Sequence, residues 1–156
     1  MMRTLLIGAL LMAPTTTTAI TLPTTWASSM VIQRGVPVTL WGLDEPGAVV
    51  TLTCTAPWCT SGLKSEPADS TGRFEVKLPA APASTTPFTI TLASTKSGSL
   101  KLSDLLVGDV YFCSGQSNME LSVENTAEQE AVLAKANTLG ATLRIFSVRL
   151  RATTSC

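Results

Sequence analysis

The sequence predicts a β-sandwich-like N-terminal region followed by the first βαβ unit of an incomplete α/β domain. Two observations support this order. Between residues 36 and 106, short stretches of alternating apolar and polar residues are separated by turn sequences and recur at spacings of roughly 8 to 15 residues, as in small β-sandwiches. Beyond Gly108 the pattern changes to an apolar run, a helical segment and a second apolar run, which is the order of a βαβ unit.

The first 20 residues have the layout of a secretory signal peptide. Arg3 precedes an apolar run at residues 5–13, and Ala19 is a small residue suited to cleavage. This run is too short to span a bilayer, so no membrane span is expected. The alternatives are an ordinary apolar N-terminal strand or a signal anchor. The signal layout predicts entry into the secretory pathway.

The β-rich N-terminal domain is expected to cover residues 21–106. Its clearest strand is Arg73–Leu78, where every second residue from Phe74 onward is apolar and one face is therefore buried. A turn is predicted at Asp44–Gly47, because proline fixes one φ angle and glycine supplies the unusual one. The predicted strands are 36–43, 48–54, 73–78, 88–92 and 100–106.

The cysteines favour a disulfide over a metal site. In an oxidising compartment disulfides persist, and Cys54 and Cys59 are close enough in sequence to close a local loop. A zinc-type site would need a second ligand pair, and the chain contains one close cysteine pair and no histidine. No metal and no cofactor are therefore expected. Cys113 is expected to be a small buried residue of a core strand.

Charge excludes some classes of partner. The chain has 11 basic and 11 acidic residues and no basic cluster. Binding to nucleic acid or to an anionic membrane surface depends on concentrated Lys and Arg, so neither is expected. The three tryptophans, Trp26, Trp41 and Trp58, suit a sugar face as readily as a core. Nothing in the sequence indicates an oligomeric state.

The last part of the chain, residues 107–156, is expected to begin a second domain. Val110–Cys113 is a predicted strand, Glu120–Leu139 a predicted helix that ends at Gly140, and Leu143–Leu150 a second strand. A parallel sheet must be covered on both faces, which one βαβ unit does not achieve. The sequence is therefore expected to stop within a domain.

Ser117 is the candidate nucleophile. It lies in the Ser-Gly-Gln-Ser-Asn turn between the predicted strand and helix, where backbone N–H groups of a helix start point toward a ligand. A serine attacks a carbonyl well only when a base, usually histidine, takes its proton and an acidic partner orients that base. The chain has no histidine. Either Ser117 is not a nucleophile, and is for example a helix N-cap, or its base lies on sequence absent from this chain.

The run Gly108–Glu120, GDVYFCSGQSNME, resembles the start of the catalytic domain of the sialate O-acetylesterases and related carbohydrate acetyl esterases of the SGNH hydrolase superfamily. Met119 stands where a G-x-S-x-G elbow needs its last glycine, so an α/β-hydrolase is less consistent with the motif. The resemblance covers about residues 29–149. Upstream segments match the family in the same order: 30–34, 38–42, 45–48, 72–74 and 78–79.

The resemblance implies an SGNH or flavodoxin-like α/β domain whose substrate is an O-acetylated sialic acid or related acetylated sugar. By position, Ser117 would be the nucleophile and its own N–H an oxyanion donor, Gly115 would permit the tight turn, and Gln116 and Asn118 would be supporting polar residues. The aspartate and histidine of the family have no matching positions, so the isolated chain is expected to be inactive. The protein would be secreted or lysosomal. The alternative is a non-catalytic, secreted β-sandwich module that binds glycans or another partner.

Overall fold

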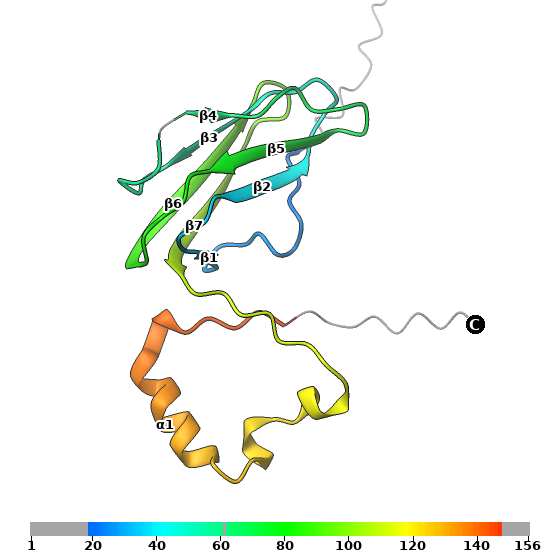
Figure 1. Cartoon of the computed structure of the whole chain (residues 1–156). Helices are drawn as coiled ribbons and strands as arrows, with labels where there is room; N and C mark the ends of the chain where they lie inside the picture. Colours follow the sequence, from blue (N-terminus) through cyan, green and yellow to red (C-terminus); the bar gives the residue numbers. More distant parts are fainter. Residues whose placement is uncertain (1–18, 61, 148–156) are drawn as a thin grey trace, which may run out of the picture.

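The computed structural model describes residues 19–60 and 62–147, and this part of the chain is mostly sheet with one α-helix (Figure 1). Residues 1–18, which hold most of the predicted signal peptide, and residues 148–156 lie outside the described part. The strands are β1 Val31–Gln33, β2 Val38–Leu43, β3 Val50–Cys54, β4 Leu63–Lys64, β5 Arg73–Leu78, β6 Ser84–Ser94 and β7 Ser99–Gly108. The helix α1 is Gln129–Leu139, and the 3-10 turns are η1 Ser117–Glu120, η2 Val123–Asn125 and η3 Gly140–Thr142.

The strands form a five-stranded sheet in the order β1-β7-β6-β3-β4 and a two-stranded sheet of β2 and β5. The sheet is curled like half a barrel (Figure 1), and one core unites both sheets. Leu40 and Leu78 from the small sheet are buried in the same cluster as Leu52, Ile90 and Leu92 from the large one. The structure confirms the predicted β-rich region but does not confirm a regular β-sandwich.

Residue alternation predicted the strands of this region well. Along β5, Phe74, Val76 and Leu78 are 2%, 1% and 1% exposed, while the residues between them face outward. The strand β6, Ser84–Ser94, extends beyond both ends of the predicted strand at residues 88–92. Its pairing with β7 is irregular between Ser84 and Phe88, which accommodates Pro87, a residue that cannot donate to a regular ladder.

The strand β1 is a feature that the sequence did not predict. No strand was predicted at residues 31–33, yet they pair in parallel with β7, with Gln33 opposite Gly108. Three residues carry too short a pattern to reveal a partner far along the chain. The pairing places the end of β1 beside the point where the chain leaves β7 toward Ser117.

The predictions made for the cysteines differ in how they agree with the structure. Cys54 and Cys59 are joined by a disulfide with their Cα atoms 6.1 Å apart, and Trp58 within this loop packs edge-on against Phe88 with ring centroids 5.3 Å apart. Cys113 is a free, exposed thiol. The expectation that Cys113 is a buried core residue is therefore wrong.

The predicted βαβ unit is not present in the described residues. Val110–Cys113 is not a strand, and Tyr111 and Phe112 are 82% and 90% exposed. The described part of the second predicted strand, residues 143–147, is not a strand either, and its remainder lies outside the description. A strand needs a ladder of backbone hydrogen bonds with a neighbour, and no described strand pairs with these segments. An SGNH or flavodoxin-like domain is accordingly not confirmed.

The helix is shorter than predicted, because α1 begins at Gln129 and not at Glu120. Upstream, the Thr126 hydroxyl donates to the Val123 carbonyl at 2.8 Å and the Asn125 amide donates to the Ser122 hydroxyl at 2.9 Å. Short polar side chains of this kind compete with the backbone pattern of a helix. The predicted end is confirmed, since Gly140 follows α1 with φ +51°.

Candidate functional site

Ser117 is an exposed residue at the first position of η1. The N-cap of this turn is Gln116, and no side chain makes a capping hydrogen bond there. Ser117 is therefore not the N-cap, which was its simplest structural role. In the part of the chain that the structure describes, its hydroxyl makes no hydrogen bond.

Unpaired backbone donors lie at the same turn. The Met119 N–H donates to the Gln116 carbonyl at 2.8 Å, which closes the turn. The N–H groups of Ser117 and Asn118 have no acceptor among residues 19–60 and 62–147. The first N–H groups of any helical turn lack an internal partner and are free to bind an anion. The serine hydroxyl and two donors thus occur within two consecutive residues.

Gly115 has a steric reason to be glycine. A Cβ atom at this position would lie 2.5 Å from Cγ of Met119, which folds back over the turn. Such a distance is far below van der Waals contact, so any side chain would displace Met119. Gln116 and Asn118 are exposed on either side of Ser117. The structure therefore brings the four predicted site residues together in one open turn, and their chemical roles remain predictions.

The start of the segment that carries Ser117 is fixed to the end of β1. Arg34 Nε lies 2.8 Å from Asp109 Oδ1, and the Val110 N–H donates to Gln33 Oε1 at 2.8 Å. The hydrogen bond and charge of Asp109 raise the pKa of Arg34 above its ordinary value. Both side chains of this ion pair are about half exposed, so the ion pair orients the chain and adds little stability.

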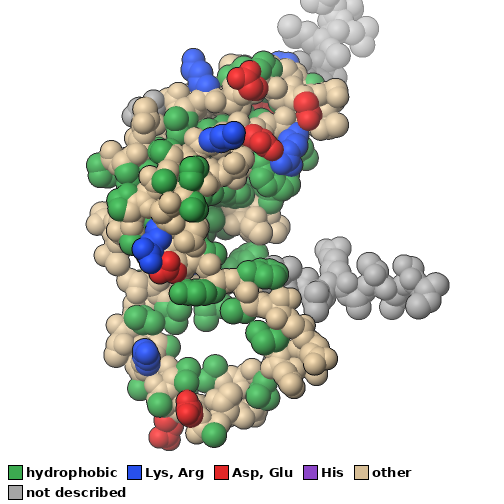
Figure 2. Space-filling model, in the orientation of Figure 1, with side chains coloured by type: hydrophobic (Ala, Val, Ile, Leu, Met, Phe, Trp, Pro, Cys, Tyr) green, Lys and Arg blue, Asp and Glu red, His purple; other side chains and the backbone are tan. Residues whose placement is uncertain are grey.

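Large apolar side chains are exposed along the segment from residue 110 to residue 146. Figure 2 shows hydrophobic side chains around an opening that this segment encloses below the β-rich part. No residue of α1 is buried. Exposed apolar surface of this extent is typical of a face that contacts other protein surface. The residues more than half exposed are Val110, Tyr111, Phe112, Met119, Leu121, Ile145 and Phe146.

The described residues do not complete a catalytic triad. The chain has no histidine, and Asp109, the acidic residue that precedes the motif, pairs with Arg34. No group of three or more His, Cys, Asp or Glu side chains among the described residues is arranged to hold a metal ion. No helix in this part of the chain has the length and apolar character needed to cross a membrane.

Comparison with known proteins identifies the family. Over 116 residues, or 71% of this chain, the sequence is 32% identical to a protein named sialate O-acetylesterase from Mus musculus. The chain belongs to the sialate O-acetylesterase family, whose members it matches over only part of their length. This match spans 21% of the mouse protein's length. The predicted resemblance of the chain to the sialate O-acetylesterase family is thereby confirmed.

A solved structure agrees with this family. A carbohydrate acetylesterase from Xanthomonas citri superposes with a TM-score of 0.65 at 31% sequence identity, over 76% of this chain and 26% of the bacterial chain. No protein-family model matches the sequence. This chain therefore spans about a quarter or less of the length of these two relatives.

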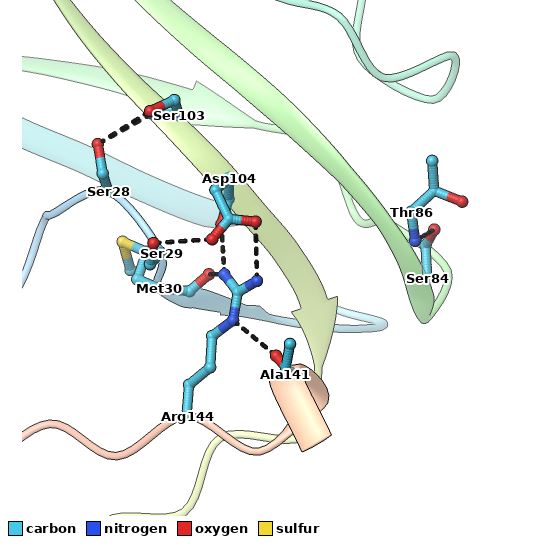
Figure 3. A network of polar contacts seen from close by, with 9 residues as sticks. All are labelled: Ser28, Ser29, Met30, Ser84, Thr86, Ser103, Asp104, Ala141 and Arg144. Atoms are coloured by element: carbon cyan, nitrogen blue, oxygen red, sulfur yellow. Dashed lines mark hydrogen bonds and ion pairs between the residues drawn. The ribbon is translucent and has the colours of Figure 1, made fainter. Parts of the chain in front are cut away.

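The polar residues Asp104, Arg144 and Ser29, which sequence reasoning did not single out, lie where the Ser117 segment returns to the sheet (Figure 3). Asp104 and Arg144 are 40 residues apart, and a hydrogen bond over such a separation leaves no local pattern. The sequence signal is weak: Arg144 is a charged residue between the apolar residues Leu143 and Ile145.

Proposed function

We propose that this chain is the N-terminal part of a serine esterase that removes O-acetyl groups from sialic acids or related acetylated sugars, with Ser117 as the nucleophile. The observation that carries the proposal is the exposed Ser117 hydroxyl beside two unpaired backbone N–H groups. The relatives' names support the substrate class, because one is a sialate O-acetylesterase and the other a carbohydrate acetylesterase.

In the proposed reaction the Ser117 oxygen attacks the acetyl carbonyl carbon and gives up its proton to a base. The N–H groups of Ser117 and Asn118 donate hydrogen bonds to the oxygen that becomes negatively charged. Donors aimed in this way typically contribute about 3 to 4 kcal/mol of transition-state stabilisation. The bond from the acetyl carbon to the sugar oxygen then breaks and the sugar leaves with a proton. Water finally hydrolyses the acetyl-serine ester and releases acetate.

The proposal includes a division of the protein into a signal peptide at residues 1–20, a β-rich domain of the sandwich type at 21–106 and the beginning of an SGNH esterase domain at 107–156. The base and its acidic partner would be supplied by further sequence. Three observations support this: the chain lacks histidine, the match spans 21% of the mouse relative, and apolar side chains are exposed around the serine turn. The isolated chain would be inactive, and the native protein would be secreted or lysosomal.

A fluorophosphonate probe tests this proposal, because it reacts with activated serines. The native protein is captured with an antibody against residues 73–87, sized by immunoblot, labelled and mapped by mass spectrometry. We expect a species heavier than the 16.4 kDa of this chain, with label on Ser117. Expressed at native length, S117A loses the label, whereas S114A, a matched change in the same exposed turn, keeps it.

The opposite results favour the alternative. A native species no heavier than this chain, or a heavier one that the probe does not label at Ser117, would contradict the esterase proposal. The better explanation would then be a non-catalytic module that binds a glycan or another partner. Binding by the β-rich domain requires no catalytic base, whereas serine acyl transfer does.

A further inference from the structure

Asp104 lies at a bulge in the strand that leads to the Ser117 segment. In the β6–β7 ladder, Ile90 pairs with Leu102 and Phe88 pairs with Leu105, so β7 has one residue more than β6 between these pairs. Asp104, within this extra length, has φ +57°. A non-glycine residue in the left-handed region is strained and persists only where its surroundings hold it. Bulges commonly redirect a side chain near a functional site.

A second strained residue holds the bulge. Ser29 has φ +63°, its N–H donates to the Ser103 carbonyl at 2.9 Å and its hydroxyl donates to Asp104 Oδ2 at 2.7 Å. The Ser103 N–H donates to the Ser28 hydroxyl at 3.0 Å. The loop before β1 therefore fixes both the backbone and the carboxylate of the bulge, as Figure 3 shows.

Arg144 binds the bulge from the returning chain. Its Nη2 lies 3.0 Å from Asp104 Oδ1, and its Nη1 donates to the carbonyl oxygens of Asp104 and, at 3.3 Å, of Met30. Its Nε donates to the Ala141 carbonyl at 3.2 Å, which ties the guanidinium to η3. Every nitrogen of the planar fork is used, an arrangement that the single ammonium of lysine does not reproduce.

The contact differs from an ordinary surface ion pair in burial. The Arg144 side chain is 15% exposed, against 52% for Arg34 in the pair with Asp109. Exposed pairs contribute little because water screens them and the side chains stay mobile. The Arg144 guanidinium is largely removed from water and bound to three backbone carbonyls and a carboxylate, so it is less free to move than the guanidinium of an exposed pair.

The two contacts bracket the serine turn. Arg34 and Gln33 hold the chain at Asp109 and Val110, and Arg144 holds it again after α1. The groups of the β-rich part that hold the segment at its two ends lie on or beside β1 and β7, which pair with each other. Between these points α1 buries no residue. Within the described residues, the ends of the segment therefore hold it in place more than an apolar core does.

We infer that Arg144 is a positioning residue, which clamps the end of the Ser117 segment to the strained bulge at Asp104 and thereby fixes the serine turn against the β-rich domain. The catalytic part of this inference rests on the proposed function, because a fixed turn matters to acyl transfer only if Ser117 reacts. The structural part does not, since the clamp acts on the segment whatever its chemistry.

A distance measurement tests the clamp without reference to activity. In a C156S, K101C background, nitroxide labels are placed on Cys113, the free thiol of the segment, and at position 101 on β7. Double electron–electron resonance then reports the distribution of distances between them. We expect a narrow distribution with Arg144 present and at least a twofold broader one in R144M, with R144K intermediate. K135M, which removes an exposed cation of α1, leaves the width unchanged.

Equal widths in R144M, D104N and the parent would overturn the inference. D104N keeps the backbone carbonyl but removes the carboxylate charge, so it is expected to broaden the distribution less than R144M. If R144M unfolds the domain, seen as loss of the tryptophan fluorescence transition, R144K and D104N decide the question.

The probe reaction separates this inference from the proposed function. In the native-length protein we expect R144M to react with fluorophosphonate at least tenfold more slowly at Ser117, with partial recovery in R144K. A parent protein that does not label contradicts the esterase proposal and leaves the distance result to judge the clamp. Normal labelling of R144M beside a broadened distance distribution would overturn the catalytic part of the inference alone.

Discussion

Gly72 offers a quantitative test of how the two-stranded sheet is built. It immediately precedes β5, its carbonyl accepts the Asp44 N–H at 2.8 Å, and its φ is +83°. A Cβ at this position would lie 2.2 Å from the Asp44 carbonyl oxygen. This oxygen belongs to the backbone, so it has little freedom to move away from the added Cβ atom. G72A therefore combines an unfavourable dihedral angle with a steric overlap.

The two costs are separable by a matched variant. Gly98 has φ +89°, and a Cβ there would meet nothing within 4 Å. G98A should cost only the left-handed conformation, about 1–2 kcal/mol. G72A should cost that amount plus an overlap of about 1–3 kcal/mol, for a total of about 2–5 kcal/mol in the free energy of unfolding.

The assay is urea denaturation followed by tryptophan fluorescence. Trp41 of β2 reports on this sheet directly, because the Arg73 guanidinium carbon, one residue after Gly72, lies 4.2 Å from its ring centroid. Both variants should unfold at lower urea concentration than the parent, G72A clearly first. Free energies of unfolding for G72A and G98A that agree within about 0.5 kcal/mol would refute the argument that backbone approach at Asp44 requires glycine.

Two further predictions concern the disulfide and the bulge. Removing the Cys54–Cys59 bond in C54A/C59A opens a loop with a sequence separation of 5; chain entropy predicts a loss of about 2 kcal/mol by urea denaturation, and an unchanged midpoint would contradict this. The pKa of Asp104 lies below its ordinary value because of hydrogen bonds from Ser29 and Arg144. Its stabilising contribution is thus fully present above the unfolded value of about 3.9 and lost as pH falls through the lower folded value. The stability difference between the parent and D104N should be constant from about pH 7 to pH 5 and shrink below about pH 4; a difference that grows on acidification would contradict the assignment.

Much of the β-rich domain was predictable because its signals are local. The alternation of Arg73–Leu78 identified both the strand and its buried face. The turn at Asp44–Gly47 was also predicted, and Gly47 has φ +75°. The order of short motifs, ending in GQSNM, indicated the family that the comparisons then showed. The strand, the turn and each single motif depend on residues within a few positions of one another.

The predictions that failed were those that need a partner far along the chain. Val110–Cys113 has the composition of a strand, but no described strand pairs with it, and its side chains are exposed. Cys113 was placed in a core on the strength of that strand and is exposed with it. Composition indicates what a segment can form, whereas a ladder forms only where a neighbour supplies donors and acceptors.

The sequence by itself determined where the candidate nucleophile Ser117 lies in the chain and that no histidine of this chain is available as its base, since the GQSN turn and the absence of histidine are facts of composition and order. Tertiary structure alone decided how that turn is held. The parallel pairing of β1 with β7 and the binding of Arg144 to Asp104 join groups 40 or more residues apart, and the bulge at Asp104 comes from an extra residue of β7 relative to β6. Side chains this distant meet only after the sheet has formed, and their contact depends on a bulge whose strain no neighbouring residue encodes.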